Sequence, residues 1–200
     1  GGLATGPIDG KMGSATKRAE QAWLRGPWRN GLTVSVAGDE RLPQSLQKWP
    51  SYAELEDFYG PPGSDLQTAT LPYPMRLSFA ANKTVTKLTM HKKVVEPMCE
   101  ALREIHSIYG LGGLREIGAD ITGGIYAPRV MRGSTKISTH AWGIAIDIDP
   151  LRNPLREGRL TARLAKDDCK DFWAVWKKVG ATSLGLARDY DWMHIQFSRL

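Results

Sequence analysis

The chain has 200 residues, of which 42% are hydrophobic and 24% are charged, and its formal net charge is +6. This length is enough for one medium-sized domain with a buried core and a small appendage. No apolar run is long enough to span a membrane, so no membrane span is expected. The basic residues are dispersed and form no nucleic-acid-binding motif, so nucleic acid is not expected as a partner. The net positive charge either favours binding to an anionic partner of another kind or only keeps the protein in solution.

The first 24 residues predict a tight turn followed by a short amphipathic helix. Gly10 and Gly13 permit the turn, and Ser14 can cap the helix. The apolar face of this helix consists of Ala15, Ala19, Ala22 and Trp23. The segment resembles part of a peptidoglycan-binding repeat, which has a turn of the D-G-x-x-G-x-x-T type. We therefore expect either a partial wall-binding segment or a helix that packs on the main domain.

A linker or wrapping arm is expected over residues 25–50, which are rich in Gly, Pro, Trp and Arg. The main domain is expected to occupy residues 51–200. Ser51 and Glu54 have the spacing of a capping box, which predicts a short helix that ends after Phe58. Hydrophobic periodicity predicts strands at 75–79, 85–90 and 117–121, and helices at 95–109 and 172–179.

Alternating residues at 144–149 predict a strand with a metal-binding face. The core face contains Ile144, Ile146 and Ile148, and the opposite face contains Ala145, Asp147 and Asp149. The small side chain of Ala145 leaves room for a metal ion beside the Asp147 carboxylate. His140 lies on the approach to this strand, and Gly143 permits a close backbone turn between them.

A second alternating stretch at 193–197 predicts a neighbouring strand that brings His194 toward Asp147. Asp191 is an odd number of residues from His194, so we expect it in the preceding loop, reaching back toward the metal. With His140, this makes a site of two histidines and a carboxylate, which leaves zinc one open position, as in catalytic zinc sites. Bound zinc lowers the pKa of water to about 7, so the pattern indicates hydrolysis with Asp191 as general base.

Other acidic residues and histidines compete for these roles. Asp149 is an alternative ligand, although an Asp followed by Pro is typical of a turn. Asp189 is a weaker competitor to Asp191 as the base. His91 and His106 are not expected to be ligands, because neither has an acidic partner at ligand spacing. The cysteines lack metal-ligand spacing and are expected to be buried free thiols: Cys99 and Cys169.

Together these motifs resemble the zinc D,D-peptidases of the VanY and phage-endolysin type. That family includes D-alanyl-D-alanine carboxypeptidases and L-alanyl-D-glutamate endopeptidases, and its pattern is S-x-H, six residues, D, then E/D-x-x-H. The resemblance runs from about Tyr59 to the C-terminus. It implies the zinc ligands His140, Asp147 and His194. It also implies that Asp191 is the catalytic base, at a position where many members carry Glu.

The same family uses an arginine upstream of the first histidine to bind substrate or to stabilise the developing oxyanion. Arg129 and Arg132 are both candidates. Residues 123–129 are similar to the family's glycine–tyrosine–arginine approach, which favours Arg129. Residues beside the ligands are expected to wall the substrate groove or to orient the ligands; they are Ser138, Trp142 and Gln196.

The expected fold class is α+β, with a small, mostly antiparallel sheet flanked by helices, as in D,D-peptidases and hedgehog-type domains. The expected function is that of a monomeric, endolysin-like zinc peptidase. Its cofactor would be Zn²⁺, its partner bacterial peptidoglycan, and its target an L-Ala-D-Glu or a D-Ala-D-Ala bond. No signal peptide is visible, which suits a phage lysin that is made in the host cytoplasm and acts at the cell wall. The alternative is a non-catalytic zinc-containing module that binds the cell wall or a partner.

Overall fold

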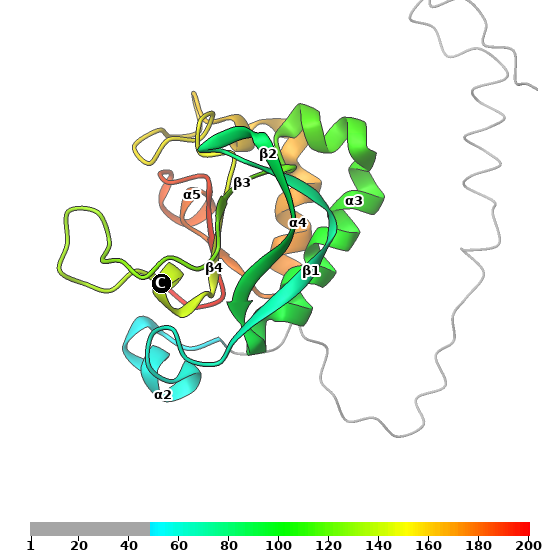
Figure 1. Ribbon diagram of the computed structural model, residues 1–200. Helices are drawn as coiled ribbons and strands as arrows, with labels where there is room; N and C mark the ends of the chain where they lie inside the picture. The colour runs from blue at the N-terminus through cyan, green and yellow to red at the C-terminus, as the bar shows by residue number, and fades with distance from the viewer. Residues whose placement is uncertain (1–48) are drawn as a thin grey trace, which may run out of the picture. The chain divides into compact units, whose positions relative to one another are not determined.

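In this computed structural model the described residues are 49–200, except for the side chain of Ala81 (Figure 1). The expectations for residues 1–24, and for the arm as far as residue 48, lie outside the described residues. The elements in chain order are η3 (Tyr52–Glu54), α2 (Leu55–Tyr59), β1 (Leu66–Leu77), β2 (Ala80–His91), η4 (Lys92–Val94), α3 (Val95–Ile117), β3 (Ile121–Gly124), η5 (Thr139–Trp142), β4 (Ala145–Ile148), η6 (Arg163–Ala165), η7 (Asp167–Cys169), α4 (Lys170–Lys178), β5 (Thr182–Ser183), α5 (Leu184–Arg188) and β6 (His194–Gln196). Within this part of the chain, no helix is long and apolar enough to cross a membrane.

The strands form one mixed sheet in the order β2-β1-β3-β4-β6-β5. The fold is therefore α+β, but the expectation of a mostly antiparallel sheet is wrong, because β1 and β3 pair in parallel. This pairing follows from the route of the chain. Strand β2 ends with His91 opposite Leu66 at the start of β1, and α3 then runs back along the sheet. Strand β3 consequently begins with Ile121 opposite Arg76 near the far end of β1.

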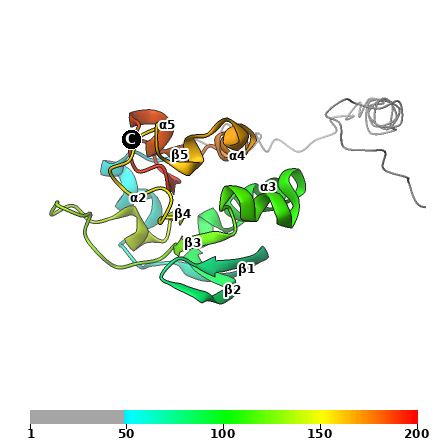
Figure 2. The same ribbon diagram turned by 90° about the horizontal axis from the view of Figure 1, so that it is seen from above.

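The core lies between this sheet and the helices α3 and α4, which pack against each other (Figure 2). Helix α3 also packs on β1. Apolar residues at helical spacing explain these contacts, since Met98, Leu102 and Ile105 are at most 1% exposed. In α4, Phe172 and Trp176 are buried to the same degree. Burial of an apolar side chain of this size contributes about 1.5–3 kcal/mol, which holds both helices against the core.

Helix α3 continues to Ile117, although the sequence predicts its end at Gly110. Gly110 has φ 60° and ψ 175°, which are not helical angles, so the helix is kinked there. The helix resumes after the kink because Leu114 and Ile117 are 0% and 2% exposed and belong to the core. Strand β3 therefore starts only at Ile121, and the strand predicted at 117–121 is wrong over most of its length.

The other predicted elements are present, with shifted ends. The capping box forms as predicted, since the backbone N–H of Ser51 donates to Glu54 Oε2 at 2.7 Å. The strand predicted at 75–79 overlaps β1 only at 75–77, and the strand predicted at 85–90 lies within β2; β1 and β2 form an antiparallel hairpin. Phe79 lies in the turn of this hairpin and is 74% exposed. Both cysteines are buried and free, as predicted.

Candidate metal centre

His140 is held in position by the short 3-10 helix η5. Ser138 precedes this helix, and its Oγ accepts a hydrogen bond from the backbone N–H of His140 at 3.4 Å. Gly143 ends the helix with φ 69°. A Cβ atom at Gly143 would lie 3.0 Å from the backbone nitrogen of His91, so glycine lets the chain turn into β4 this close to β2. His140 is 3% exposed and faces the neighbouring strands.

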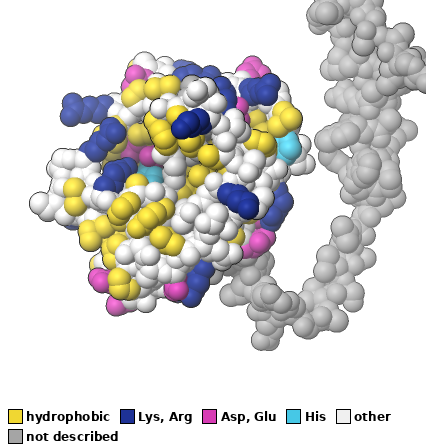
Figure 3. Space-filling view, viewed as in Figure 1, with side chains coloured by type: hydrophobic (Ala, Val, Ile, Leu, Met, Phe, Trp, Pro, Cys, Tyr) yellow, Lys and Arg dark blue, Asp and Glu magenta, His cyan; other side chains and the backbone are white. Residues whose placement is uncertain are grey.

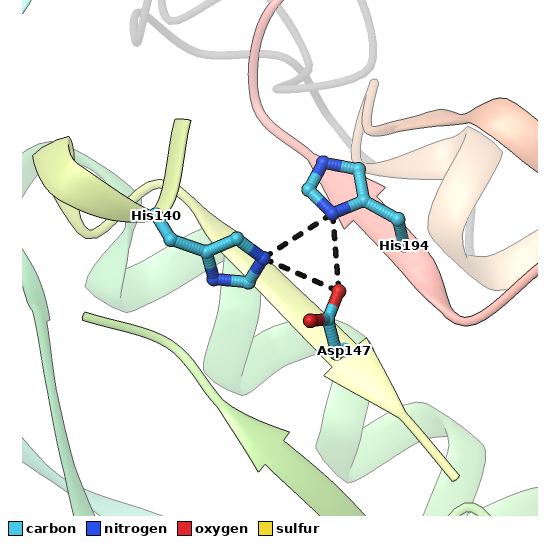
Figure 4. Close-up of side chains that lie close together, drawn as sticks. All are labelled: His140, Asp147 and His194. Atoms are coloured by element: carbon cyan, nitrogen blue, oxygen red, sulfur yellow. Dashed lines mark hydrogen bonds and ion pairs between the residues drawn. The ribbon is translucent and has the colours of Figure 1, made fainter. Parts of the chain in front are cut away.

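The antiparallel pairing of β4 and β6 brings the other two predicted ligands together, because Asp147 lies opposite His194 in the register. Asp147 Oδ1 is 3.2 Å from His140 Nε2 and 3.1 Å from His194 Nδ1. The two nitrogens are 3.3 Å apart (Figure 4). The three donor atoms therefore form a nearly equilateral triangle, in which side chains from η5, β4 and β6 point toward one another.

Hydrogen bonds on the outer sides of both imidazole rings determine which nitrogens carry protons. His140 Nδ1 lies 2.8 Å from the carbonyl oxygen of Ile125, which can only accept, so Nδ1 is the donor. His194 Nε2 lies 3.0 Å from Gln196 Oε1, and the amide nitrogen of the same glutamine donates to Ser198. Nε2 is therefore also a donor. The inner nitrogen of each neutral ring is left with a lone pair that points into the triangle.

Three electron pairs that converge at this distance repel one another unless positive charge lies between them. In the absence of a metal ion, protons are drawn to this position. Burial lowers the pKa of the His194 imidazole, but its hydrogen bond to Asp147 and the charge of that carboxylate outweigh burial and raise it. Burial also raises the pKa of Asp147, but hydrogen bonds from both histidines hold it well below its usual range. The triangle can hold a divalent metal ion, and the outer hydrogen bonds orient its imidazoles.

Asp191 lies in the loop before β6, as predicted, and both of its backbone polar groups are bonded. Its N–H donates to the carbonyl of Leu155 at 2.9 Å, and its carbonyl accepts from the N–H of His194 at 3.0 Å. The residue is 7% exposed, and Oδ1 has no hydrogen-bond partner among the described residues. Burial raises the pKa of this carboxyl to about 6, although the charge of His194 lowers it somewhat. These are properties of a general base.

The competing carboxylates lie outside the triangle. Asp149, the alternative ligand, is buried and forms an ion pair with Arg152. Asp189, the alternative base, is partly exposed and forms an ion pair with Arg159 at 3.1 Å. The remaining histidines of the described part make aromatic contacts elsewhere, His91 with Tyr59 and His106 with Tyr73.

A cavity of about 570 Å³ opens over the triangle. In Figure 3, histidine and acidic side chains lie in a hollow with basic side chains along its rim. Ser138 and Gln196 line the cavity and are hydrogen-bonded to His140 and His194. Trp142 does not line it, because its indole N–H donates to a backbone carbonyl in the loop after α2, at 2.9 Å. Both predicted arginines are in the lining, Arg129 and Arg132.

Arg156 and Tyr190 are among the lining residues that were not predicted from the sequence. Arg156 belongs to the loop between β4 and η6, and no motif distinguishes it from Arg152 and Arg159 in the same loop. Only the structure distinguishes these arginines, because Arg152 and Arg159 form ion pairs with carboxylates. Tyr190 could have been found from its position directly before Asp191.

One comparison with known proteins gives a match. Residues 132–197 match the family model for D-alanyl-D-alanine carboxypeptidase. The matched segment contains the whole triangle and Asp191, whereas Arg129 lies just before it. Comparison with curated proteins and with solved structures gave no significant match. The match supports the interpretation of the chain as a peptidase related to the D,D-peptidase superfamily, and the matched segment contains the triangle.

Proposed function

We propose that the chain is a zinc-dependent peptidoglycan peptidase that hydrolyses an amide bond of the cell-wall stem peptide. One observation carries this proposal: three converging metal donors and a buried carboxylate with a raised pKa, Asp191, line the same cavity. The match to the D-alanyl-D-alanine carboxypeptidase family supports this class of substrate. The proposed partner is bacterial peptidoglycan, which the chain would meet as a monomer at the cell wall.

Zinc fits the donor set of two imidazole nitrogens and one carboxylate oxygen. Zinc–ligand distances of about 2.0–2.1 Å around a tetrahedral centre place neighbouring ligand atoms about 3.3 Å apart. The separations in the triangle are 3.1, 3.2 and 3.3 Å. His140, Asp147 and His194 would therefore hold zinc with little rearrangement, and three protein ligands leave a position for water or substrate.

A bound metal ion would polarise the scissile carbonyl and lower the pKa of a water molecule. Asp191 accepts the proton of the attacking water and donates it to the leaving amine. Burial raises the pKa of this carboxyl to about 6 in the metal-free protein, which makes it a stronger proton acceptor than an exposed aspartate while it is still ionised at neutral pH. Arg129, with Arg132 near it in the cavity lining, holds a substrate carboxylate or stabilises the developing oxyanion.

Two bonds of the stem peptide are candidates for cleavage. A D-Ala-D-Ala carboxypeptidase recognises a free terminal carboxylate, whereas an L-Ala-D-Glu endopeptidase accepts internal bonds and lyses walls. We favour the endolysin-like endopeptidase, because the sequence of residues 1–24 resembles part of a wall-binding repeat. Removal of these residues should then weaken binding to purified sacculi, and unchanged binding would exclude them as a wall anchor.

Digestion of purified peptidoglycan with and without a chelator tests the proposed function. The released fragments are read by mass spectrometry. New amino termini at D-Glu establish an endopeptidase, and loss of one terminal D-Ala establishes a carboxypeptidase. The His194→Ala variant is the matched control for contaminating hydrolases, since it should release neither product. A protein that binds zinc and releases no chelator-sensitive product from several wall types contradicts the proposal and favours a non-catalytic binding module.

A further inference from the structure

The arginines that line the cavity differ from most other arginines of residues 49–200. Most of the arginines outside the cavity form ion pairs with carboxylates, namely Arg76, Arg103, Arg152, Arg159, Arg163 and Arg199. Arg129, Arg132 and Arg156 form no ion pair with a described residue, and all three line the cavity. The only carboxylates of that lining are Asp147 and Asp191, which the proposed function assigns to the metal ion and the base. With a divalent cation bound, the cavity carries an excess of positive charge.

Two separate loops supply this positive charge. Arg129 and Arg132 belong to the loop between β3 and η5, and Arg156 belongs to the loop between β4 and η6. In Figure 1 the first loop extends to the left of the sheet, and the second lies at the top of the view. One carboxylate is often held by a single guanidinium group, through two parallel N–H···O hydrogen bonds. Cations on two different loops are better suited to two different anionic groups of one ligand.

The loop that carries Arg156 is fastened to the loop that carries the proposed base. In the loop of Arg156, the backbone carbonyl of Leu155 accepts a hydrogen bond from the backbone N–H of Asp191 at 2.9 Å. Three residues after Arg156, the backbone N–H of Arg159 donates to Asp189 Oδ1 at 2.7 Å. The Arg159 guanidinium pairs with the same carboxylate at 3.1 Å. Bonds before and after Arg156 therefore set its backbone position relative to Asp191.

We propose that Arg156 is a specificity residue that binds a second carboxylate of the substrate, so that the cavity selects stem peptides with two carboxylates. This inference rests on the proposed function and names its substrate more closely. Arg129 and Arg132 take one carboxylate, and Arg156 takes the other on the side of Asp191. In a stem peptide, D-glutamate offers such a carboxylate in addition to the terminal one. Amidation of D-glutamate removes both the charge and one acceptor oxygen, and weakens the contact with guanidinium.

Equilibrium binding of two synthetic stem peptides tests this inference. The peptides differ only at D-glutamate, whose carboxylate is free in one and a carboxamide in the other. Calorimetry on the zinc-loaded full chain carrying Asp191→Ala, which should keep zinc but not hydrolyse either peptide, avoids turnover. We expect the acidic peptide to bind about tenfold more tightly, which corresponds to about 1.4 kcal/mol. Arg156→Gln should abolish this difference by weakening the acidic peptide much more than the amidated one, and Arg156→Lys should retain part of it.

Arg188→Gln is the matched control. Arg188 is exposed and forms no ion pair with a described residue, but it does not line the cavity, so its replacement should leave the preference intact. The inference is overturned if the chain with Arg156 intact binds both peptides equally or binds neither, or if Arg156→Gln weakens both to the same extent. If the wild type digests peptidoglycan but the acidic peptide is not bound more tightly, the role of Arg156 is refuted and the proposed peptidase activity stands. Charge-selective binding without any digestion refutes the peptidase instead.

Discussion

Replacement of Asp191 by Asn should stabilise the metal-free protein at neutral pH. Burial raises the pKa of the Asp191 carboxyl from its ordinary value of 3.8 to about 6. The folded state therefore binds this proton more tightly than the unfolded state does. As a consequence, the contribution of this carboxyl to stability is most favourable below about pH 4, is lost as the pH rises through about 6, and stays lost above that value. Asn cannot ionise, so the Asp191→Asn variant escapes this loss.

The size of the effect follows from the pKa. A rise of about two units corresponds to about 3 kcal/mol, at 1.36 kcal/mol per unit. This is an upper limit, because the amide of Asn leaves a buried polar group where Oδ1 of Asp191 has no partner among the described residues. We expect a gain of about 1–3 kcal/mol in the free energy of unfolding at about pH 7.5, and most of it should disappear at about pH 4.

Urea unfolding in the presence of a chelator, at both pH values, measures this gain. Asp189→Asn is a matched control two residues away. Burial acts to raise the pKa of Asp189 too, but hydrogen bonds from Arg159 and Trp192 outweigh it and lower the pKa, so this change should not stabilise. If Asp191→Asn gives no gain at about pH 7.5, or the same gain at both pH values, Asp191 is not held in a desolvating environment.

Three further substitutions test the candidate metal ligands, the candidate base and the turn beside them. His194→Ala should lose bound zinc, measured by elemental analysis, and a wild-type zinc content would contradict its assignment as a ligand. Asp191→Ala should keep zinc but lose hydrolysis of peptidoglycan, because the proton acceptor is gone; full activity would exclude Asp191 as the base. Gly143→Ala should destabilise the fold by about 1–3 kcal/mol, because a non-glycine residue is strained at positive φ. The added Cβ would also lie 3.0 Å from the backbone nitrogen of His91. Urea unfolding checks this last expectation, and an unchanged midpoint would show that the turn adapts without cost.

Local features of the sequence were sufficient to predict that Asp147, His194 and Asp191 lie together at the candidate site. Alternation at 144–149 puts Asp147 on the face opposite the buried isoleucines, and alternation at 193–197 puts His194 on the corresponding face of its own strand. The odd spacing between Asp191 and His194 predicted that Asp191 lies in a loop. Each of these inferences uses only the period of a strand or the chemistry of one side chain, which a single segment of sequence contains.

Tertiary structure alone decided the features that depend on segments far apart in the chain. The parallel pairing of β1 with β3 depends on how far α3 carries the chain, and α3 continues past Gly110 because Leu114 and Ile117 find places in the core. The inward nitrogen of His140 is set by the carbonyl of Ile125 in a different segment. Arg156 reaches the cavity through hydrogen bonds between two loops. No periodicity specifies such contacts, because the free energy that selects them arises from packing and hydrogen bonding between residues distant in sequence.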